Sequence, residues 1–242
     1  MSFYQSIASY YDYIFPPSQA QGNFVEEKLE GLSGKMILEA GCGTGNLARI
    51  LAEKDARVEG IDLDAEMIRK ALRRSSEVLD IRFRELDILD IDNVWPPETF
   101  DGIVSFGNTL VHLSDDLEVA DFFKKARKLL KPGGKLMVQI INYDRILDQD
   151  IRGLSAIDNE HVRFERYYDP VEDMEHIDFR TVLTVKTSGK IIRNLVRLYP
   201  IREKQIENLL KESGYQNIEF WGNFGGDPLN ASSVPLVFAA QA

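Results

Sequence analysis

A glycine-rich loop between an apolar strand and a helix is the feature that most constrains this chain. Residues 37–48 run from an apolar stretch through Glu39 into glycines at positions 41, 43 and 45, and then into helix-forming residues. Glycine tolerates positive φ and lets the backbone approach a ligand where a Cβ would clash. Strand–loop–helix turns of this kind bind nucleotide-like ligands at the carboxyl ends of parallel strands. The loop therefore predicts an α/β fold with a ligand site at that edge of the sheet.

The spacing of the glycines separates two kinds of ligand. A dinucleotide-binding loop reads G-x-G-x-x-G, and this chain has Asn46 where the third glycine would stand. Its own pattern is G-x-G-x-G, preceded by Glu39. A nicotinamide-dependent oxidoreductase on a similar sheet is an alternative, and Asn46 argues against it.

Composition favours one globular domain, residues 1–242. Apolar residues make up 44% of the chain and charged residues 28%, as in ordinary soluble proteins. The net charge of −10 argues against a nucleic-acid partner, because neutralising phosphates requires a basic face. No apolar run is long enough for a bilayer and no signal peptide is recognisable, so we expect a cytoplasmic protein without membrane contact. Cys42 is the only cysteine, and His161 and His176 lack metal-ligand spacing, so we expect no metal site. The oligomeric state is not indicated.

Strand and helix patterns alternate as far as residue 141. Strands are expected at residues 36–39, 57–62, 81–85, 102–106 and 135–141, with helices near residues 24–32, 47–53, 65–75 and 117–130. Strands separated by helices of this length form βαβ units, and hence a doubly wound, Rossmann-like sheet that is mostly parallel. The Lys-Pro-Gly-Gly sequence at residues 131–134 is expected to be the turn before the fifth strand.

The pattern becomes polar and aromatic after residue 141. Alternating runs, typical of antiparallel strands, occur at residues 162–168, 177–186 and 190–198. We expect this insertion, residues 143–199, to form an antiparallel lid subdomain over the carboxyl edge of the main sheet. A helix at residues 201–212 and strands at residues 217–221 and 234–240 complete the chain, and the last strand is expected to be antiparallel.

Three acidic residues follow three successive strands. Glu39 ends the first strand, Asp62 ends the second, and Asp87 comes after the third. Asp62 lies about twenty residues beyond the glycine loop, the spacing at which a carboxylate accepts both hydrogens of a ribose diol. The alternative is that Asp62 or Asp64 caps the following helix, and Asp64 fits that role better because it directly precedes the helix.

These features together resemble the class I S-adenosylmethionine-dependent methyltransferases. The resemblance covers the glycine loop as motif I, the carboxylates at positions 62 and 87, and residues 100–106 as the fourth strand. It implies S-adenosylmethionine as the cofactor, with residues 87 and 88 against the adenine. The cofactor-binding residues that it implies are Glu39, Ala40, Gly41, Gly43, Gly45, Asp62, Leu63, Met67, Asp87, Ile88, Phe106, Thr109 and His112.

The catalytic half resembles glycine N-methyltransferase. The match begins with FGNTLVHL at residues 106–113, and shorter matches follow in order as far as residues 222–224. The resemblance places Asn108 against the acceptor, Tyr168 and Tyr199 in the acceptor pocket, and Tyr4 in an N-terminal helix over the cofactor. It implies methyl transfer to a small molecule, at an amine nitrogen. An O-methyltransferase of a small molecule and a non-catalytic S-adenosylmethionine-binding protein stay open as alternatives.

One position departs from the glycine N-methyltransferase pattern. Those enzymes have an arginine directly before Asn-Tyr-Asp, where it binds the carboxylate of the substrate, and this chain has Ile141 there. A butyl side chain cannot replace the bidentate bond of a guanidinium group. Either the acceptor has no carboxylate, or an arginine of the insertion binds it instead. The candidates are Arg145, Arg166, Arg193 and Arg197.

Overall fold

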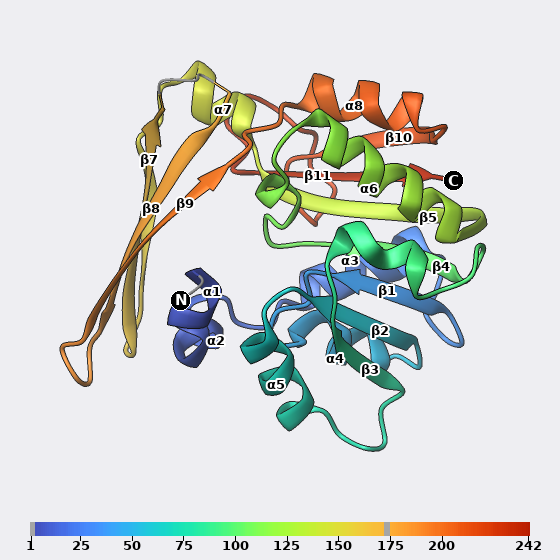
Figure 1. Cartoon of the computed structure of the whole chain (residues 1–242), viewed down its shortest axis with the longest axis horizontal. Helices are drawn as coiled ribbons and strands as arrows, with labels where there is room; N and C mark the ends of the chain where they lie inside the picture. The colour runs from blue at the N-terminus through green and yellow to red at the C-terminus, as the bar shows by residue number, and fades with distance from the viewer. Residues whose placement is uncertain (1–2, 172–174) are drawn as a thin grey trace.

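Two β-sheets organise the chain in the computed structural model, which describes residues 3–171 and 175–242 (Figure 1). The seven-stranded main sheet contains, in spatial order, β10 (Gln216–Trp221), β11 (Pro235–Gln241), β5 (Leu130–Ile141), β4 (Phe100–Ser105), β1 (Met36–Ala40), β2 (Arg57–Asp62) and β3 (Ile81–Glu85). The neighbouring pairs from β5 to β3 are parallel, and β11 runs antiparallel to both of its neighbours. The prediction of a mostly parallel sheet with an antiparallel last strand is confirmed.

Helices cover both faces of the main sheet. They are α3 (Gln19–Lys28), α4 (Asn46–Ala52), α5 (Ala65–Arg74), α6 (Asp116–Leu129) and α8 (Glu203–Glu212). Successive side chains of a strand point to opposite faces, so Ile37 packs with α3 and α4 while Leu38 packs with α6 and α8. Both faces of β1 are therefore buried, and four of its five residues are apolar, as is typical of a buried parallel strand. Among the described residues, no helix combines the length and apolar character needed to cross a membrane.

The second sheet is antiparallel and lies beside the main sheet. It contains β6 (Gly153–Asp158), β7 (Val162–Pro170), β8 (Ile177–Val185) and β9 (Ile191–Leu198). The short helices α1 (Phe3–Ile7) and α2 (Tyr11–Ile14) lie between the two sheets (Figure 1). Ile7 and Ile14 pack there against a small apolar cluster of the second sheet, which includes Phe164. The N-terminal helices are therefore held between the two sheets.

Several element boundaries differ from the sequence-based expectation. The helix expected at residues 24–32 is α3, which ends at Lys28 because Glu30 and Gly31 adopt positive φ. The turn expected at residues 131–134 lies inside β5, which begins at Leu130 and shifts its register against β4 near Pro132 and Gly133. Strand β6 and helix α7 (Tyr143–Asp148) were not expected, because their short sequences carry no clear apolar period.

We predict that the second sheet opens more readily than the main sheet. Its apolar cluster is small, and the outer face of β9 exposes Ile191 and Leu195. Segments with few buried contacts open locally at low free-energy cost, and covers of binding sites must open. Hydrogen exchange should be fast in β7 to β9 without ligand. It should slow when S-adenosylhomocysteine, the demethylated form of the cofactor that the sequence resemblance implies, is bound. The amides of β1 are the internal control, and unchanged exchange in the second sheet would contradict the prediction.

Candidate active site

Two adjoining cavities lie at the carboxyl ends of the parallel strands. The first cavity has a volume of about 370 Å³ and reaches the second sheet, and the second cavity has a volume of about 330 Å³ and reaches α5. Tyr4, Tyr11, Phe106 and His112 line both cavities. Side chains from the N-terminus, the main sheet and the second sheet therefore enclose one continuous site.

The second cavity contains the carboxylate at the end of β2. Asp62 Oδ2 accepts a 2.8 Å bond from the amide of Gly43, and its Oδ1 accepts a 2.9 Å bond from the amide of Asp64. Burial raises the pKa of Asp62 to about 6, and the two amides partly offset this effect. An ionised carboxylate has about four acceptor positions, so both oxygens can still receive hydroxyl groups of a ligand. Asp64 caps α5 by accepting from the amides of Glu66 and Met67, as the helix-cap interpretation predicted.

The glycines of the loop have different neighbours. A Cβ on Gly41 would come within 2.3 Å of Thr109, and one on Gly43 would lie 3.3 Å from the ring of Tyr11. Gly45 instead faces the core, where a Cβ would come within 2.5 Å of Phe83. All three have positive φ. The first two glycines thus keep the loop open beside the cavities, and the third allows close packing between the loop and β3.

Glu39 places a buried carboxyl group against the first cavity. Burial raises the pKa of Glu39 to about 8, and a bond from the backbone of Ala48 only partly offsets this rise. Its Oε2 is buried and has no hydrogen-bond partner in the described part of the chain. A buried carboxyl of this kind can bind a positively charged group, because ionisation becomes favourable when a cation lies beside it. S-adenosylmethionine carries two such charges, on its amino group and on its sulfonium, so the residues present fit this cofactor.

Tyr4 and His112 meet between the two cavities. The phenol of Tyr4 lies 2.8 Å from His112 Nε2, and burial lowers the pKa of His112 to about 4. The imidazole is therefore neutral at physiological pH. His112 belongs to the 3-10 helix η3 (Leu110–His112), directly after the loop that contains Asn108.

The amide of Asn108 is fixed in the first cavity by two hydrogen bonds. Its Oδ1 accepts a 2.9 Å bond from the amide of Ile141, and its Nδ2 donates a 3.1 Å bond to the hydroxyl of Tyr143. The backbone of Asn108 has a φ of 75°, a conformation that asparagine tolerates better than most residues. One N–H and one oxygen lone pair of this amide are left for a ligand.

Most of the predicted site residues lie at the two cavities. The residues that line them are Tyr4, Glu39, Gly41, Gly43, Asp62, Leu63, Met67, Asp87, Ile88, Phe106, Asn108, Thr109, His112 and Tyr168. Ala40 is buried in the main core, beneath the site rather than at its surface. Tyr199 lies away from both cavities, where its hydroxyl donates to Asp116 and accepts from Gln205. The structure thus places Ala40, Gly45 and Tyr199 outside the cavity lining.

Sequence reasoning missed some side chains of the site, among them Phe164. It lines the first cavity from β7, together with Tyr168 and with Arg166, which was already one of the four candidate arginines. The alternation of these three positions was the available signal, since alternate residues of a strand share a face. Asp12 was also missed. It accepts hydrogen bonds from Thr44 and Asn46 of the glycine loop, at 2.6 and 2.9 Å, and so ties α2 to that loop.

Comparison with known proteins identifies the family. Residues 37–134, from β1 into β5, match the model of a methyltransferase domain. A solved S-adenosylmethionine-dependent methyltransferase from Clostridium acetobutylicum superposes with a TM-score of 0.80 at 21% identity, covering 99% of both chains. The chain is a class I S-adenosylmethionine-dependent methyltransferase. The prediction of family, enzyme class and cofactor is thereby confirmed.

Relatives of this methyltransferase act on different atoms, as their names state. A glycine/sarcosine/dimethylglycine N-methyltransferase of Actinopolyspora halophila is 24% identical over 85% of the chain, which spans 36% of the length of that relative. A ubiquinone biosynthesis O-methyltransferase of Idiomarina loihiensis is 29% identical, covering 76% of both proteins. Similarity alone therefore leaves the acceptor atom open.

We predict that Asp62 contributes strongly to cofactor affinity. Asp62→Ala should weaken S-adenosylhomocysteine binding about ten- to a hundredfold, because it removes charge-assisted hydrogen bonds worth roughly 1.5–3 kcal/mol. Asp115→Ala is the matched control, since it removes a comparable helix cap, that of α6, and Asp115 lines neither cavity. Calorimetry should also show no tight NAD binding to the wild type. Equal affinity of the Asp62 variant and the wild type would refute this role.

We also predict that cofactor binding releases a proton from Glu39. The raised pKa means that the carboxyl is mostly protonated at pH 7 in the ligand-free protein, whose stability falls as pH rises from about 4.5 toward about 8. A bound cation favours the carboxylate, so binding of S-adenosylhomocysteine at pH 7 should release about one proton. Calorimetry in buffers of different ionisation enthalpy measures this release, and Glu39→Gln should abolish it. Buffer-independent binding heat in the wild type would contradict the prediction.

Proposed function

We propose that this methyltransferase methylates an amine nitrogen of a small molecule bound in the first cavity. The observation that carries the proposal is the fixed amide of Asn108, which lines the first cavity with one donor and one acceptor position free. S-adenosylmethionine supplies a methyl group already activated on its sulfonium, so the task of the protein is placement. The nitrogen lone pair forms the new N–C bond while the S–C bond breaks. The electrons of that bond stay on sulfur, and the nitrogen then loses its proton to solvent.

Two titratable groups that line the first cavity, His112 and Tyr168, support nitrogen over oxygen. Burial lowers the pKa of His112 to about 4 and raises the pKa of Tyr168 to about 12. A hydroxyl acceptor needs proton removal during attack, whereas an amine that binds unprotonated needs no base at that moment. Neither His112 nor Tyr168 is a strong base near pH 7. We infer that the second sheet is an insertion within a single catalytic domain and covers the site.

We predict that Asn108 is needed for turnover but not for cofactor binding. Labelled S-adenosylmethionine should transfer its methyl group to members of a panel of small amines in preference to matched phenols. Asn108→Gly keeps the positive φ and should lower turnover about 10- to 100-fold, the effect of losing one well-oriented contact. Calorimetry should show nearly unchanged affinity of that variant for S-adenosylhomocysteine.

Tyr143→Phe is the control for orientation. It removes the hydroxyl that fixes the amide and leaves the amide itself, so its loss of turnover should be smaller than that of Asn108→Gly. Turnover of Asn108→Gly at the wild-type rate would refute the acceptor contact. Efficient methylation of phenols alone would replace the amine proposal with O-methylation.

A further inference from the structure

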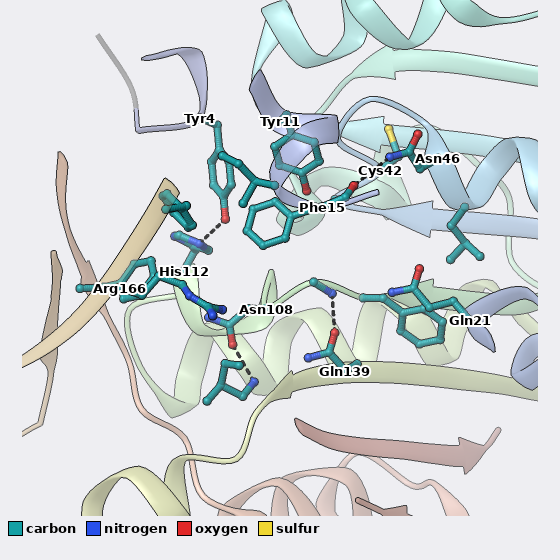
Figure 2. A pocket seen from close by; sticks show the side chains of 18 of the residues that line it. Tyr4, Tyr11, Phe15, Gln21, Cys42, Asn46, Asn108, His112, Gln139 and Arg166 are labelled. Atoms are coloured by element: carbon teal, nitrogen blue, oxygen red, sulfur yellow. Dashed lines mark hydrogen bonds between the residues drawn. The ribbon is translucent and has the colours of Figure 1, made fainter. Parts of the chain in front are cut away.

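The first cavity contains a guanidinium group that comes from the second sheet. Phe164, Arg166 and Tyr168 alternate along β7 and all line the cavity, because alternate residues of a strand face the same side. Figure 2 shows Arg166 extending into the pocket on the same side as Asn108 and His112. Arg166 is the only arginine or lysine among the described residues that line this cavity.

This guanidinium has no anionic partner in the described part of the chain. Its Nη2 donates a 2.6 Å bond to the carbonyl of Ser155, and its Nε is buried without a partner. Two arginines with outward positions on the same sheet are paired, Arg163 with Asp158 and Glu165, and Arg180 with Asp169. Arg166, which points inward, thus differs from these two arginines because no carboxylate among the described residues pairs with it.

An unpaired and partly buried cation is costly, because the protein replaces only part of its hydration. Burial lowers the pKa of the Arg166 guanidinium, and the nearby phenol of Tyr168 only partly offsets this effect. The cost is recovered when an anion enters the cavity and accepts the free N–H groups. Planar guanidinium groups match the oxygens of carboxylates and phosphates in two-point contacts.

A second arginine lies near the same phenol. Arg145 of α7 has a buried Nη1 without a partner among the described residues, and both Arg145 and Arg166 lower the pKa of Tyr168. The other candidates are placed differently. Arg193 and Arg197 lie on the exposed face of β9, where Arg197 pairs with Asp178. The positive potential near Tyr168 therefore comes from Arg166 with support from Arg145.

We propose that Arg166 binds an oxyanion group of the methyl acceptor, a carboxylate or a phosphate, and so selects anionic amines as substrates. This inference rests on the proposed function, because it identifies the substrate class of the same site. Ile141 also lines the first cavity but carries no charge. The cation that binds the anion of the acceptor therefore comes from Arg166, on a different strand. Since Arg166 and Asn108 lie on the same side of the pocket, the anion and the attacking nitrogen belong to neighbouring parts of one small molecule (Figure 2).

The test is anion binding to the methyltransferase saturated with S-adenosylhomocysteine. Acetate, inorganic phosphate and neutral acetamide are titrated at constant ionic strength and followed by calorimetry. At least one of the two anions should bind the wild type about tenfold or more tighter than acetamide. Arg166→Gln should remove this preference. Arg163→Gln, which removes an equal charge from the outer face of the same strand, should keep it.

Each outcome has a defined meaning. Preference for acetate alone indicates carboxylate acceptors, and preference for phosphate alone indicates phosphate monoesters. A wild type without preference for anions, or a preference that survives in Arg166→Gln, overturns the proposal. Thermal unfolding without ligand provides a second measurement. Removal of an unpaired cation should leave the melting temperature equal or higher, whereas a purely structural arginine would lower it. Because no methyl transfer is measured, failure of the proposed amine methylation would appear separately, in the acceptor assay.

Discussion

The hydrogen bond from the amide of Gly43 to Asp62 is the contact on which the site depends. It joins the loop after β1 to the end of β2, and the amides of Gly41 and Cys42 reinforce this junction by donating to the carbonyl of Ile61. The loop consequently has one shape, with its backbone turned toward the cavities. The same carboxylate that shapes the loop also lines the second cavity, so loop geometry and ligand contact cannot be changed independently.

Charge is distributed unevenly along the first cavity. Glu39 supplies a carboxyl group from the main sheet, and Arg166 supplies a guanidinium group from the second sheet. Each group has one buried atom, Oε2 of Glu39 and Nε of Arg166, that has no hydrogen-bond partner among the described residues. A cationic cofactor and an anionic acceptor would therefore each satisfy the group on its own side. The protein as a whole is acidic, with a net charge of −10, yet Arg166 gives the first cavity a positive charge on the side of the second sheet.

The main sheet and the strand ends that line the two cavities could be predicted from the sequence, because the parallel strands are largely apolar and carry Glu39 next to the end of β1 and Asp62 at the end of β2. The part of the site that the second sheet contributes could not be predicted to the same extent. Alternation along β7 groups Arg166 with Phe164 and Tyr168, but which face of β7 turns toward the site depends on how the second sheet packs against the rest of the chain. Tyr199 was assigned by resemblance, and in this chain it lies just beyond the end of β9, where Asp116 binds its hydroxyl. Local patterns specify strands, whereas the direction of a single side chain depends on packing between distant segments.

The bonds from Thr44 and Asn46 to Asp12 have a kinetic consequence. They fasten α2 to the glycine loop, while Tyr4 and Tyr11 of the same N-terminal segment line both cavities. Movement of this segment away from the cavities must break both bonds, so a bulky cofactor that enters or leaves past the segment does so only while they are broken. A smaller acceptor can arrive after the segment has closed. The expected kinetic scheme is therefore ordered, with the cofactor binding first and leaving last.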